Sequence, residues 1–368
     1  MFFKIISGMK YLFPHIFVIF HRKSVFLQCI YEGFRPSFGK DYLKDTTMNI
    51  LIADSGSTKT DWSLIDEQGQ VVMTCKTQGI NPIHMQDAEV LQILKVELIL
   101  PESPAEVYFY GSGVTEAMKP RMNSLLQQAF PGARVEAEGD MIGAARSLFG
   151  NKPGIACILG TGANSCLYDG HRMVMNTPPL GYILGDEGSG AVLGKLFLNG
   201  IFKGSLSSSI KKKFLDWSGL DYPTIINKVY RKPLANRFLA SLCPFISQQI
   251  AEGEKHENGT DELNDAMALY RVVLGNFNDF YEKNLLPYIK YVKASAQDIS
   301  QLEPGVKAWD LSLGEDVPAV GFVGSIAHYF ESPLRNVMED EFHLKIAKIL
   351  KAPMPGLILY HSQPRKQI

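Results

Sequence analysis

The same short pattern occurs twice in the sequence, and it restricts the folds that the chain can adopt. An apolar stretch, 49–53, ends at a turn of Gly, Ser and Thr, and a second strand-like stretch, 61–65, leads to a turn that contains Asp66. The stretch 155–159 begins a second copy with the same order of features, in which Asp169 occupies the later turn. Two copies of a strand–turn–strand unit, each followed by helices, predict an α/β protein built from two similar lobes.

Strand and helix patterns alternate through the rest of the chain. Apolar runs at 106–110, 134–137 and 319–323 each precede a helical pattern, which is typical of an α/β protein. One predicted helix ends at Pro287 and carries an apolar stripe that we interpret as ordinary core. The members of the stripe are Leu263, Met267, Tyr270, Leu274, Phe277 and Tyr281.

The length of the chain predicts two domains and a leader. Its 368 residues, of which 46% are hydrophobic, are enough for two ordinary globular domains. We place one lobe at 48–153 and the other, with additional helices, at 154–368. The leader, 1–47, carries seven Lys and Arg residues against three Asp and Glu, so its net charge is +4 and that of the rest of the chain is −5.

The leader is interpreted as an upstream extension without a stable fold. Its apolar run, 11–20, is interrupted by Pro14 and His15, and it is too short for a membrane-spanning helix. No small-residue cleavage site follows it, whereas Met48 directly precedes a strong strand pattern. We therefore expect Met48 to be the biological start, and a membrane anchor is the alternative.

Charge and cysteine content exclude several classes of protein. The net charge of −1 and the pI near 6.7 are unlike the basic character of nucleic-acid-binding proteins, so no nucleic-acid partner is expected. The spacing of the five cysteines suits neither a disulfide framework nor a zinc site. Reduced, mostly buried thiols are typical of a cytoplasmic protein, which is the location that we predict. The cysteines are Cys29, Cys75, Cys157, Cys166 and Cys243.

The turn between the first two strands, Asp54–Thr60, has the composition of a phosphate-binding loop. Gly56 and the small residues around it allow backbone N–H groups to approach an anion closely. Asp54 ends the incoming strand, where a carboxylate can hold Mg²⁺ through water. The alternative is a polar hairpin turn without a ligand, and the sequence contains no Walker A pattern.

Two further positions could carry chemistry. The turn Gly160–Asn164 is the counterpart of the first turn in the repeated unit, and two such turns, one from each lobe, would hold a triphosphate between them. Asp140 ends another strand and begins a helix, at the kind of edge from which α/β proteins present functional groups. The alternative for Asp140 is a helix cap without a catalytic role.

Five motifs occur in the order that is found in a known family. They are Ala53–Asp61, Gly79–Pro82, Leu159–Ser165, Gly185–Ser189 and Val323–Ala327. Together they resemble the N-acetylglucosamine kinase group of the BadF/BadG/BcrA/BcrD-type ATPases, in the superfamily of sugar kinases, heat-shock protein 70 and actin. The resemblance covers the chain from Met48 to His361.

The resemblance implies both a fold and an activity. The fold is the α/β, two-lobed actin/hexokinase-type ATPase fold, with duplicated ribonuclease H-like units and a cleft between the lobes. The activity is ATP- and Mg²⁺-dependent phosphorylation of a hydroxyl group of an amino sugar, with N-acetylglucosamine as the first substrate to test. The expected partner is therefore a small sugar, and a homodimer is left open.

The resemblance also implies roles for individual residues. Asp140 is the catalytic carboxylate that faces the accepting hydroxyl, and Asp54 is the magnesium partner. Asn81, Asn164 and Asp186 contact the sugar. The residues that bind ATP are Gly56, Ser57, Thr58, Lys59 and Thr60 in the first turn, Gly160, Thr161 and Gly162 in the second turn, and Gly324 and Ser325 on the adenosine side.

Two other functions are weighed against this one. A BadF-type ATPase that activates a dehydratase holds an iron–sulfur cluster, which needs closely placed thiolates that the cysteine positions do not offer. A non-catalytic sugar-binding regulator on the same fold is disfavoured because Asp54, Asp140 and both glycine turns are intact.

Overall fold

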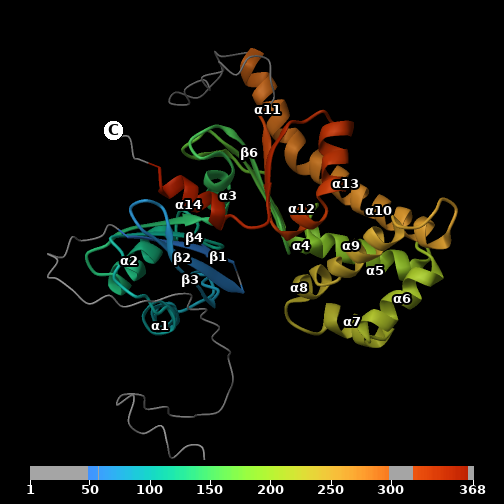
Figure 1. The fold of residues 1–368 in the computed structure, drawn as a ribbon, viewed down its shortest axis with the longest axis horizontal. Helices are drawn as coiled ribbons and strands as arrows, with labels where there is room; N and C mark the ends of the chain where they lie inside the picture. Colours follow the sequence, from blue (N-terminus) through green and yellow to red (C-terminus); the bar gives the residue numbers. More distant parts are fainter. Residues whose placement is uncertain (1–48, 57, 298–317, 364–368) are drawn as a thin grey trace, which may run out of the picture. The chain divides into compact units, whose positions relative to one another are not determined.

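The computed structural model describes residues 49–56, 58–297 and 318–363. These residues form two five-stranded mixed sheets with helices packed on them (Figure 1), as the alternation of strand and helix patterns predicted. The predictions for the leader 1–47, Cys29 and Ser57 lie outside the described residues.

The first sheet has the strand order β3-β2-β1-β4-β5. Strands β1, β4 and β5 are parallel, and β2 and β3 continue from β1 as an antiparallel meander. The strands are β1 (Ile50–Ser55), β2 (Lys59–Ile65), β3 (Val71–Gln78), β4 (Glu106–Gly111) and β5 (Arg134–Gly139). Parallel strands end at the same edge, so the carboxyl ends of β1, β4 and β5 meet there.

The second sheet repeats this topology, with the strand order β10-β9-β6-β7-β8. Strand β6 takes the place of β1, because β7 and β8 continue from it as an antiparallel meander and β9 and β10 are parallel to it. The strands are β6 (Gly154–Leu159), β7 (Ala163–Tyr168), β8 (Met173–Met175), β9 (Val320–Val323) and β10 (Ile346–Leu350). The matched order of the strands confirms the predicted internal duplication.

Both faces of the first sheet are covered by helices, which explains why its central strand β1 is apolar from Ile50 to Ala53. One face packs against α1 (Asp87–Gln92), the π-helical turn η2 (Ile93–Glu97) and α2 (Lys119–Ala129). Leu51 of β1 points to this side, and the next residue, Ile52, points to the other. The other face packs against α14 (Met354–His361), the last helix of the described chain.

Helix α3 (Asp140–Phe149) contacts strands of both sheets. It follows β5 directly, and it also packs against α14, which returns from the second sheet to the first. The contact between the two helices is close, because a methyl group added to Gly356 would lie 2.2 Å from the carbonyl oxygen of Ser147. The helix that begins at Asp140 is therefore fixed on several sides.

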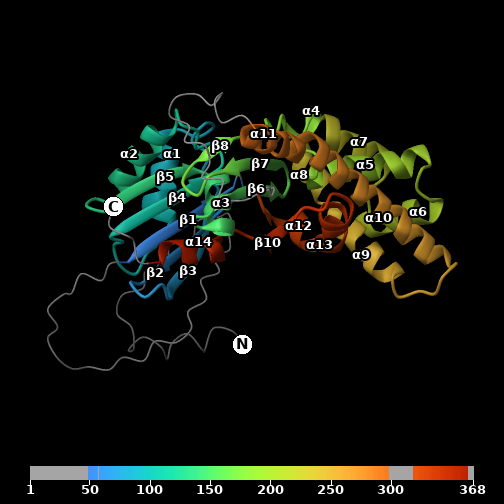
Figure 2. The ribbon, with the colours of Figure 1, turned by 90° about the horizontal axis from the view of Figure 1, so that it is seen from above.

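The remaining helices lie in the second half of the chain, and α5 to α10 form one cluster in which α10 contacts α5 and α9 (Figure 2). They are α4 (Gly181–Leu184), α5 (Gly190–Lys203), α6 (Ser208–Ser218), α7 (Tyr222–Tyr230), α8 (Ala235–Ala240), α9 (Cys243–Gly253), α10 (Asp261–Phe280), η3 (Tyr281–Leu285), α11 (Leu286–Gln297), α12 (Ser325–Tyr329), α13 (Glu331–Arg335) and η5 (Asn336–Glu341).

The buried face of α10 differs from the predicted stripe. Phe277 is buried as expected, but Met267 is 48% exposed. The buried apolar residues of this helix are Ala266, Leu269, Val273, Phe277 and Phe280. Small residues decide the packing here, because Gly253 of α9 approaches so closely that a methyl group on it would lie 2.2 Å from Cβ of Ala266.

Pro287 does not end the helical segment, contrary to the prediction. Helix α11 begins at Leu286, directly after the π-helical turn η3. Proline donates no backbone hydrogen bond and its ring crowds the preceding turn. A wider π-helical turn just before the proline accommodates both effects, so the chain continues as a helix.

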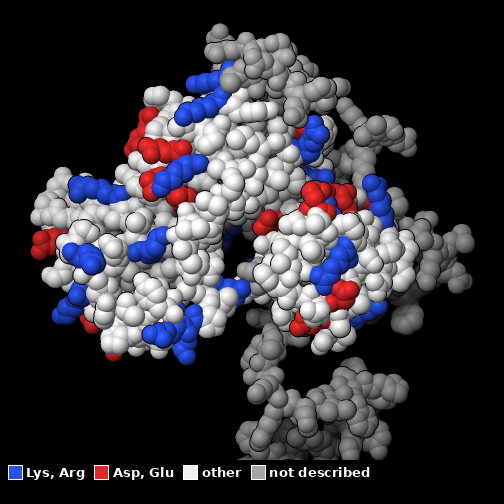
Figure 3. Space-filling model, turned by 180° about the vertical axis from the view of Figure 1, so that it is seen from behind, with Lys and Arg blue, Asp and Glu red and all other residues white. Residues whose placement is uncertain are grey.

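The charged surface is mixed on the face that Figure 3 shows, where Lys and Arg side chains are interspersed with Asp and Glu. Such a mixture produces no strong long-range field of one sign. Across the described ranges, no helix combines the length and the apolar character that crossing a membrane would take.

Candidate active site

The register of the first sheet brings Asp54 and Asp140 to the same edge. Asp54 is the last but one residue of β1 and pairs with Tyr110 of β4. The next strand along, β5, ends at Gly139. Asp140 follows immediately as the first residue of α3. Both carboxylates thus occupy the carboxyl ends of parallel strands, where α/β proteins commonly bind ligands.

The first glycine turn is closed by hydrogen bonds within the chain. The N–H group of Gly56 donates to the carbonyl oxygen of Lys59 at 3.0 Å, and the buried hydroxyl groups of Ser55 and Thr60 lie 2.7 Å apart. A methyl group added to Gly56 would have 3.8 Å to its nearest neighbour. A methyl group would therefore fit at Gly56 without a clash, so the protein itself does not require glycine there.

The side chains at the tip of this turn are exposed. Thr58 and Lys59 both face solvent, and Nζ of Lys59 lies 2.6 Å from Oδ2 of Asp61. A second ammonium group, that of Lys76, lies 3.4 Å from Oδ1 of the same carboxylate. Asp61 thus holds two cationic side chains beside the turn.

Asp54 is partly buried among other carboxylates. The pKa of Asp54 is raised to about 7. The largest cause is burial, and the negative charges of Asp61 and Asp140 add to it, whereas the positive charge of Lys59 lowers the pKa. A divalent cation would offset these like charges, so the site suits Mg²⁺. Across the described ranges, His, Cys, Asp and Glu form no group of three or more that could hold a metal, and a Mg²⁺ ion that keeps most of its waters needs only one or two carboxylates.

Asp140 is held in place by its neighbours. Its Oδ1 accepts a hydrogen bond from the N–H group of Met141 at 2.9 Å. Burial raises the pKa of Asp140, while hydrogen bonds from the backbone and from the side chain of Ser112 lower it. The N-cap position of α3 belongs to Gly139, and Asp140 is the first residue of the helix.

Asn81 lies near the first glycine turn and next to Gly113, which follows β4. Its side-chain Oδ1 accepts a hydrogen bond from the N–H group of Ile83 at 3.0 Å, and it would lie 2.2 Å from a methyl group on Gly113. The preceding residue, Ile80, both donates to and accepts from the Ser55 hydroxyl at 3.0 Å. Nδ2 of Asn81 has no partner among the described residues, and this amide group is available to a ligand.

The second glycine turn, after β6, is also closed by a hydrogen bond within the turn, and it is one residue shorter than the first. The N–H group of Gly160 donates to the carbonyl oxygen of Gly162 at 3.0 Å. The carbonyl oxygens of Gly160 and Thr161 accept hydrogen bonds from Gly190 and Ala191, at the start of α5, at 2.9 and 3.1 Å. A methyl group on Gly160 would meet nothing closer than 3.9 Å, so it would fit there without a clash.

Asp186 lies against this second turn. Its Oδ2 would be 3.0 Å from a methyl group on Gly162, and its carboxylate accepts a hydrogen bond from the N–H group of Ala163. Burial raises the pKa of Asp186. The residue has a φ of 57°, which is uncommon outside glycine, although Asp adopts it more readily than most residues.

Asn164 occupies the start of β7, just beyond the second turn. Its Oδ1 accepts hydrogen bonds from the N–H group of Ser165 and from Nδ2 of Asn176, both at 2.9 Å. Its own Nδ2 has no partner within the described part of the chain. The oxygen is thus used to fix the amide, and the nitrogen is left for a ligand.

Gly324 must be glycine for reasons within the protein. It has a φ of 128°, and a methyl group on it would lie 2.2 Å from the carbonyl oxygen of Leu159. Leu159 immediately precedes Gly160, so this contact places Gly324 and Ser325, the exposed first residue of α12, next to the second turn. The structure therefore brings together the second-lobe residues that the sequence singled out.

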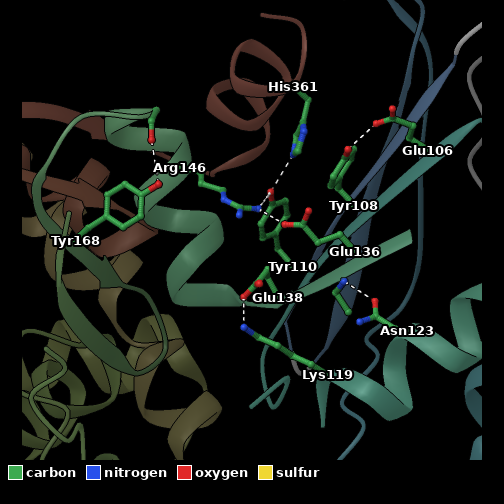
Figure 4. A network of polar contacts seen from close by, with 12 residues as sticks. Glu106, Tyr108, Tyr110, Lys119, Asn123, Glu136, Glu138, Arg146, Tyr168 and His361 are labelled. Carbon is green, nitrogen blue, oxygen red and sulfur yellow. Dashed lines mark hydrogen bonds and ion pairs between the residues drawn. The ribbon is translucent and has the colours of Figure 1, made fainter. Parts of the chain in front are cut away.

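A buried polar network fixes α3 (Figure 4). Nη1 of Arg146 lies 2.8 Å from the hydroxyl oxygen of Tyr110 in β4 and 2.6 Å from Oε1 of Glu136 in β5. The Tyr110 hydroxyl is also 2.9 Å from Nε2 of His361 in α14. The network joins two strands and two helices, and it orients the helix that begins at Asp140.

The sequence alone assigned no role to Asp61 or Ser112. Asp61 could have been found from the hairpin register, because it lies directly opposite Asp54. Ser112 follows β4, and its contact with Asp140 depends on the parallel pairing of β4 with β5. That pairing joins segments far apart in the chain, and no local pattern in the sequence reveals it.

Comparison with known proteins identifies solved structures with the same fold. Neither a family model nor a curated protein matches the chain. The chain is similar to a solved structure from Porphyromonas gingivalis that is provisionally named an N-acetylglucosamine kinase. The two share 40% sequence identity with a TM-score of 0.71, and the match covers 85% of this chain and 98% of that one. A structure of the same provisional name from Chromobacterium violaceum has 20% identity and a TM-score of 0.57 over 86% of this chain and 99% of that one, and it supports the fold alone.

The duplicated sheets and these similarities define a sugar kinase with the two-lobed, actin-like ATPase fold. At 40% identity over nearly the whole of the Porphyromonas gingivalis protein, the chain belongs to the N-acetylglucosamine kinase-like family of this superfamily.

Proposed function

We propose that the protein transfers the γ-phosphoryl group of ATP to a hydroxyl group of an amino sugar, and that N-acetylglucosamine is the substrate. The observation that carries the proposal is the placement of Asp54 and Asp140 at one sheet edge, close enough for the charge of Asp140 to raise the pKa of Asp54. The provisional name of the Porphyromonas gingivalis relative supports the choice of sugar.

Asp140 is the group that orients the sugar hydroxyl in this proposal. The hydroxyl oxygen attacks the γ-phosphorus, its bond to phosphorus forms as the bond to the β–γ bridging oxygen breaks, and ADP leaves with the electron pair of that bond. The proton of the hydroxyl passes to the carboxylate of Asp140 late in the reaction. Because the transition state of phosphoryl transfer is loose, positioning and charge neutralisation do most of the work.

The two glycine turns are the proposed phosphate-binding elements. Gly56, Thr58, Lys59 and Thr60 form the described part of the first turn, and Gly160, Thr161 and Gly162 form the second. A methyl group would fit at both Gly56 and Gly160 without a clash, so no contact within the protein requires glycine there, which supports this assignment. Gly324 and Ser325 are assigned to the adenosine side because they adjoin the second turn. Ser57, assigned on the resemblance alone, lies outside the described residues.

Asp54 is the proposed partner of Mg²⁺, which would neutralise phosphate charge in the reaction. The negative charges of Asp61 and Asp140 help to keep Asp54 partly protonated near neutral pH. A bound cation would offset these charges and favour the ionised carboxylate, which supports a cation site at Asp54. Asn81, Asn164 and Asp186 are the proposed sugar ligands, since each presents a fixed amide or carboxylate beside a glycine turn.

Among the described residues, the cysteines give no support to an iron–sulfur activator. Cys157, Cys166 and Cys243 are buried, and burial raises the pKa of both Cys166 and Cys243 to about 12. A cluster ligand must be a thiolate within reach of the metal. The location in the cytoplasm stays a prediction from the sequence, and a homodimer stays open.

A coupled assay of ADP release tests the proposal. The protein is incubated with Mg²⁺, ATP and, in turn, N-acetylglucosamine, glucosamine, N-acetylmannosamine and glucose, and the sugar phosphate is identified by mass spectrometry. We expect release with N-acetylglucosamine to exceed that with glucose by at least about tenfold in kcat/KM. ADP release that is independent of every sugar would indicate an ATPase instead, and no release at all would favour a non-catalytic regulator.

A further inference from the structure

The loop that follows Asn81 is held by an arginine from helix α2. The guanidinium group of Arg121 donates from Nε to Oδ1 of Asp87 at 2.7 Å and from Nη2 to the carbonyl oxygen of Met85 at 2.8 Å. It also donates from Nη1 to the carbonyl oxygen of Pro82. One planar group therefore binds both ends of the turn 82–85 and the first residue of α1.

The turn contributes few bonds of its own. The carbonyl oxygen of Asn81 accepts hydrogen bonds from the N–H groups of His84 and Met85, both at 3.1 Å, and the side chain of Asn81 accepts one from Ile83. The chain on the other side of Asn81 is fixed separately, because Ile80 is bonded to the hydroxyl group of Ser55. Asn81 thus lies between one anchor in the first glycine turn and a second anchor at Arg121.

The space around the Asn81 side chain is narrow. Gly113, with a φ of 84°, lies so close that a methyl group on it would be 2.2 Å from Oδ1 of Asn81. The amide can move away from Gly113 only if the turn 82–85 moves with it, since Ile83 of that turn donates to its oxygen. Loss of the second anchor would therefore displace the amide group from the proposed sugar site.

We infer that Arg121 is a positioning residue for the sugar, which sets the place of Asn81 through the turn 82–85 without touching the substrate. This inference rests on the proposed function. It assigns a substrate-specific effect to a residue that belongs to neither glycine turn and to none of the proposed ligand sets.

The two kinds of contact that Arg121 makes predict different results. Its side chain is 32% exposed and that of Asp87 is 62% exposed, so the ion pair alone contributes little. The bonds to the two carbonyl oxygens need the fork of a guanidinium group, which lysine cannot reproduce. Arg121→Lys should therefore behave much like Arg121→Met, and Asp87→Asn should behave much like the wild type.

Steady-state kinetics test the inference. In Arg121→Met and Arg121→Lys, we expect the KM for N-acetylglucosamine to rise about tenfold, with kcat and the KM for ATP within about twofold of the wild type. Arg134→Met, which removes an exposed arginine of the same lobe, is the matched control and should change none of these values. Equal increases in the KM for the sugar and for ATP, or none in either variant, would overturn the inference.

Hydrogen exchange separates this inference from the proposed function. In Arg121→Lys, the amides of Ile83, His84 and Met85 should exchange at least about tenfold faster than in the wild type, whereas the amide of Ile80 should not change. Unaltered exchange of these three amides would refute the positioning role even in an active kinase. Faster exchange in a protein that phosphorylates no sugar would uphold the anchor and refute the proposed function alone.

Discussion

Asp54 of β1 and Asp61 of β2 lie directly opposite each other across an antiparallel pair, so two carboxylates share the end of one hairpin. Like charges in this arrangement repel. Asp61 is compensated by Lys59 and Lys76, at 2.6 and 3.4 Å, whereas the pKa of Asp54 is raised to about 7. The hairpin therefore concentrates negative charge at the place where we propose that a cation binds.

Replacement of Asp54 by Asn should stabilise the protein at pH 8, by on the order of 2 kcal/mol. The carboxyl group has a pKa of about 7 in the native state and about 4 when unfolded. The native state thus binds more protons between these values, and the wild type loses stability as the pH rises from about 4 to about 7. Urea unfolding at pH 8 and at pH 4 measures the difference, which should vanish at the lower pH.

Magnesium provides the matching control. With ATP present at pH 8, Mg²⁺ should raise the melting temperature of the wild type more than that of Asp54→Asn, because only the wild type offers the carboxylate. An Asp54→Asn protein that is less stable than the wild type at pH 8 would contradict the proposed repulsion.

Replacement of Asp140 by Asn should lower kcat by at least about 100-fold and leave the melting temperature unchanged or higher. The amide cannot accept the proton of the sugar hydroxyl, and it removes a carboxylate whose pKa is raised by burial. Only the ionised form of Asp140 accepts the proton, so the activity of the wild type should fall as the pH decreases. Because the pKa of Asp140 is raised, this fall should occur at a higher pH than it would for an ordinary carboxyl group. Asp216→Asn, on the exposed face of α6, should keep full activity. Retention of near-normal turnover by Asp140→Asn would remove Asp140 from its assigned role.

The glycines of the site should separate into two kinds. Gly160→Ala should fold normally, since the nearest atom to the added methyl group would be 3.9 Å away, but its KM for ATP should rise at least about tenfold. Gly324→Ala should lose about 3 kcal/mol of stability, because its methyl group would collide with Leu159 and its φ is 128°. Thermal denaturation and ATP titrations of both variants check this. A Gly160→Ala protein with an unchanged KM for ATP would argue against the phosphate assignment.

Replacement of Arg146 by Met should destabilise the protein by about 3 kcal/mol. Arg146 is a mostly buried partner of Glu136 and Tyr110, and its loss leaves both polar groups without this donor. Arg172→Met removes an arginine that is 69% exposed and paired with Asp169, and it should cost less than about 1 kcal/mol. Denaturant unfolding compares the two, and equal losses would show that the network contributes nothing beyond a surface ion pair.

Local patterns in the sequence predicted the strands and the turns of the site. The apolar strand followed by a glycine turn appears in both halves, and the structure confirms it as a duplicated sheet topology. Asp54 and Asp140 could be placed at strand ends because the change from an apolar run to polar residues marks the edge of a sheet.

Contacts between segments that are distant in the sequence could not be predicted from local patterns. The buried face of α10 was misplaced because the tight contact of Ala266 with Gly253 favours small side chains that a pattern of large apolar residues overlooks. Pro287 was misread because a π-helical turn ahead of it absorbs its effect. The bonds of Arg121 to the turn after Asn81 link residues 36 and 39 positions apart, and no spacing rule connects them.

Helix α14 lies near the end of the chain but packs on the first sheet, so the first sheet is synthesised long before the helix that covers it. Leu357 packs with Ile52, Tyr108 and Tyr110. One apolar face of the first sheet is therefore covered only by residues that are synthesised some three hundred positions after Ile52. A ribosome that has released only the first half of the chain presents this face uncovered. We therefore expect the nascent first lobe to depend on chaperones, and a fragment covering 49–153 to aggregate unless a peptide of α14 is supplied.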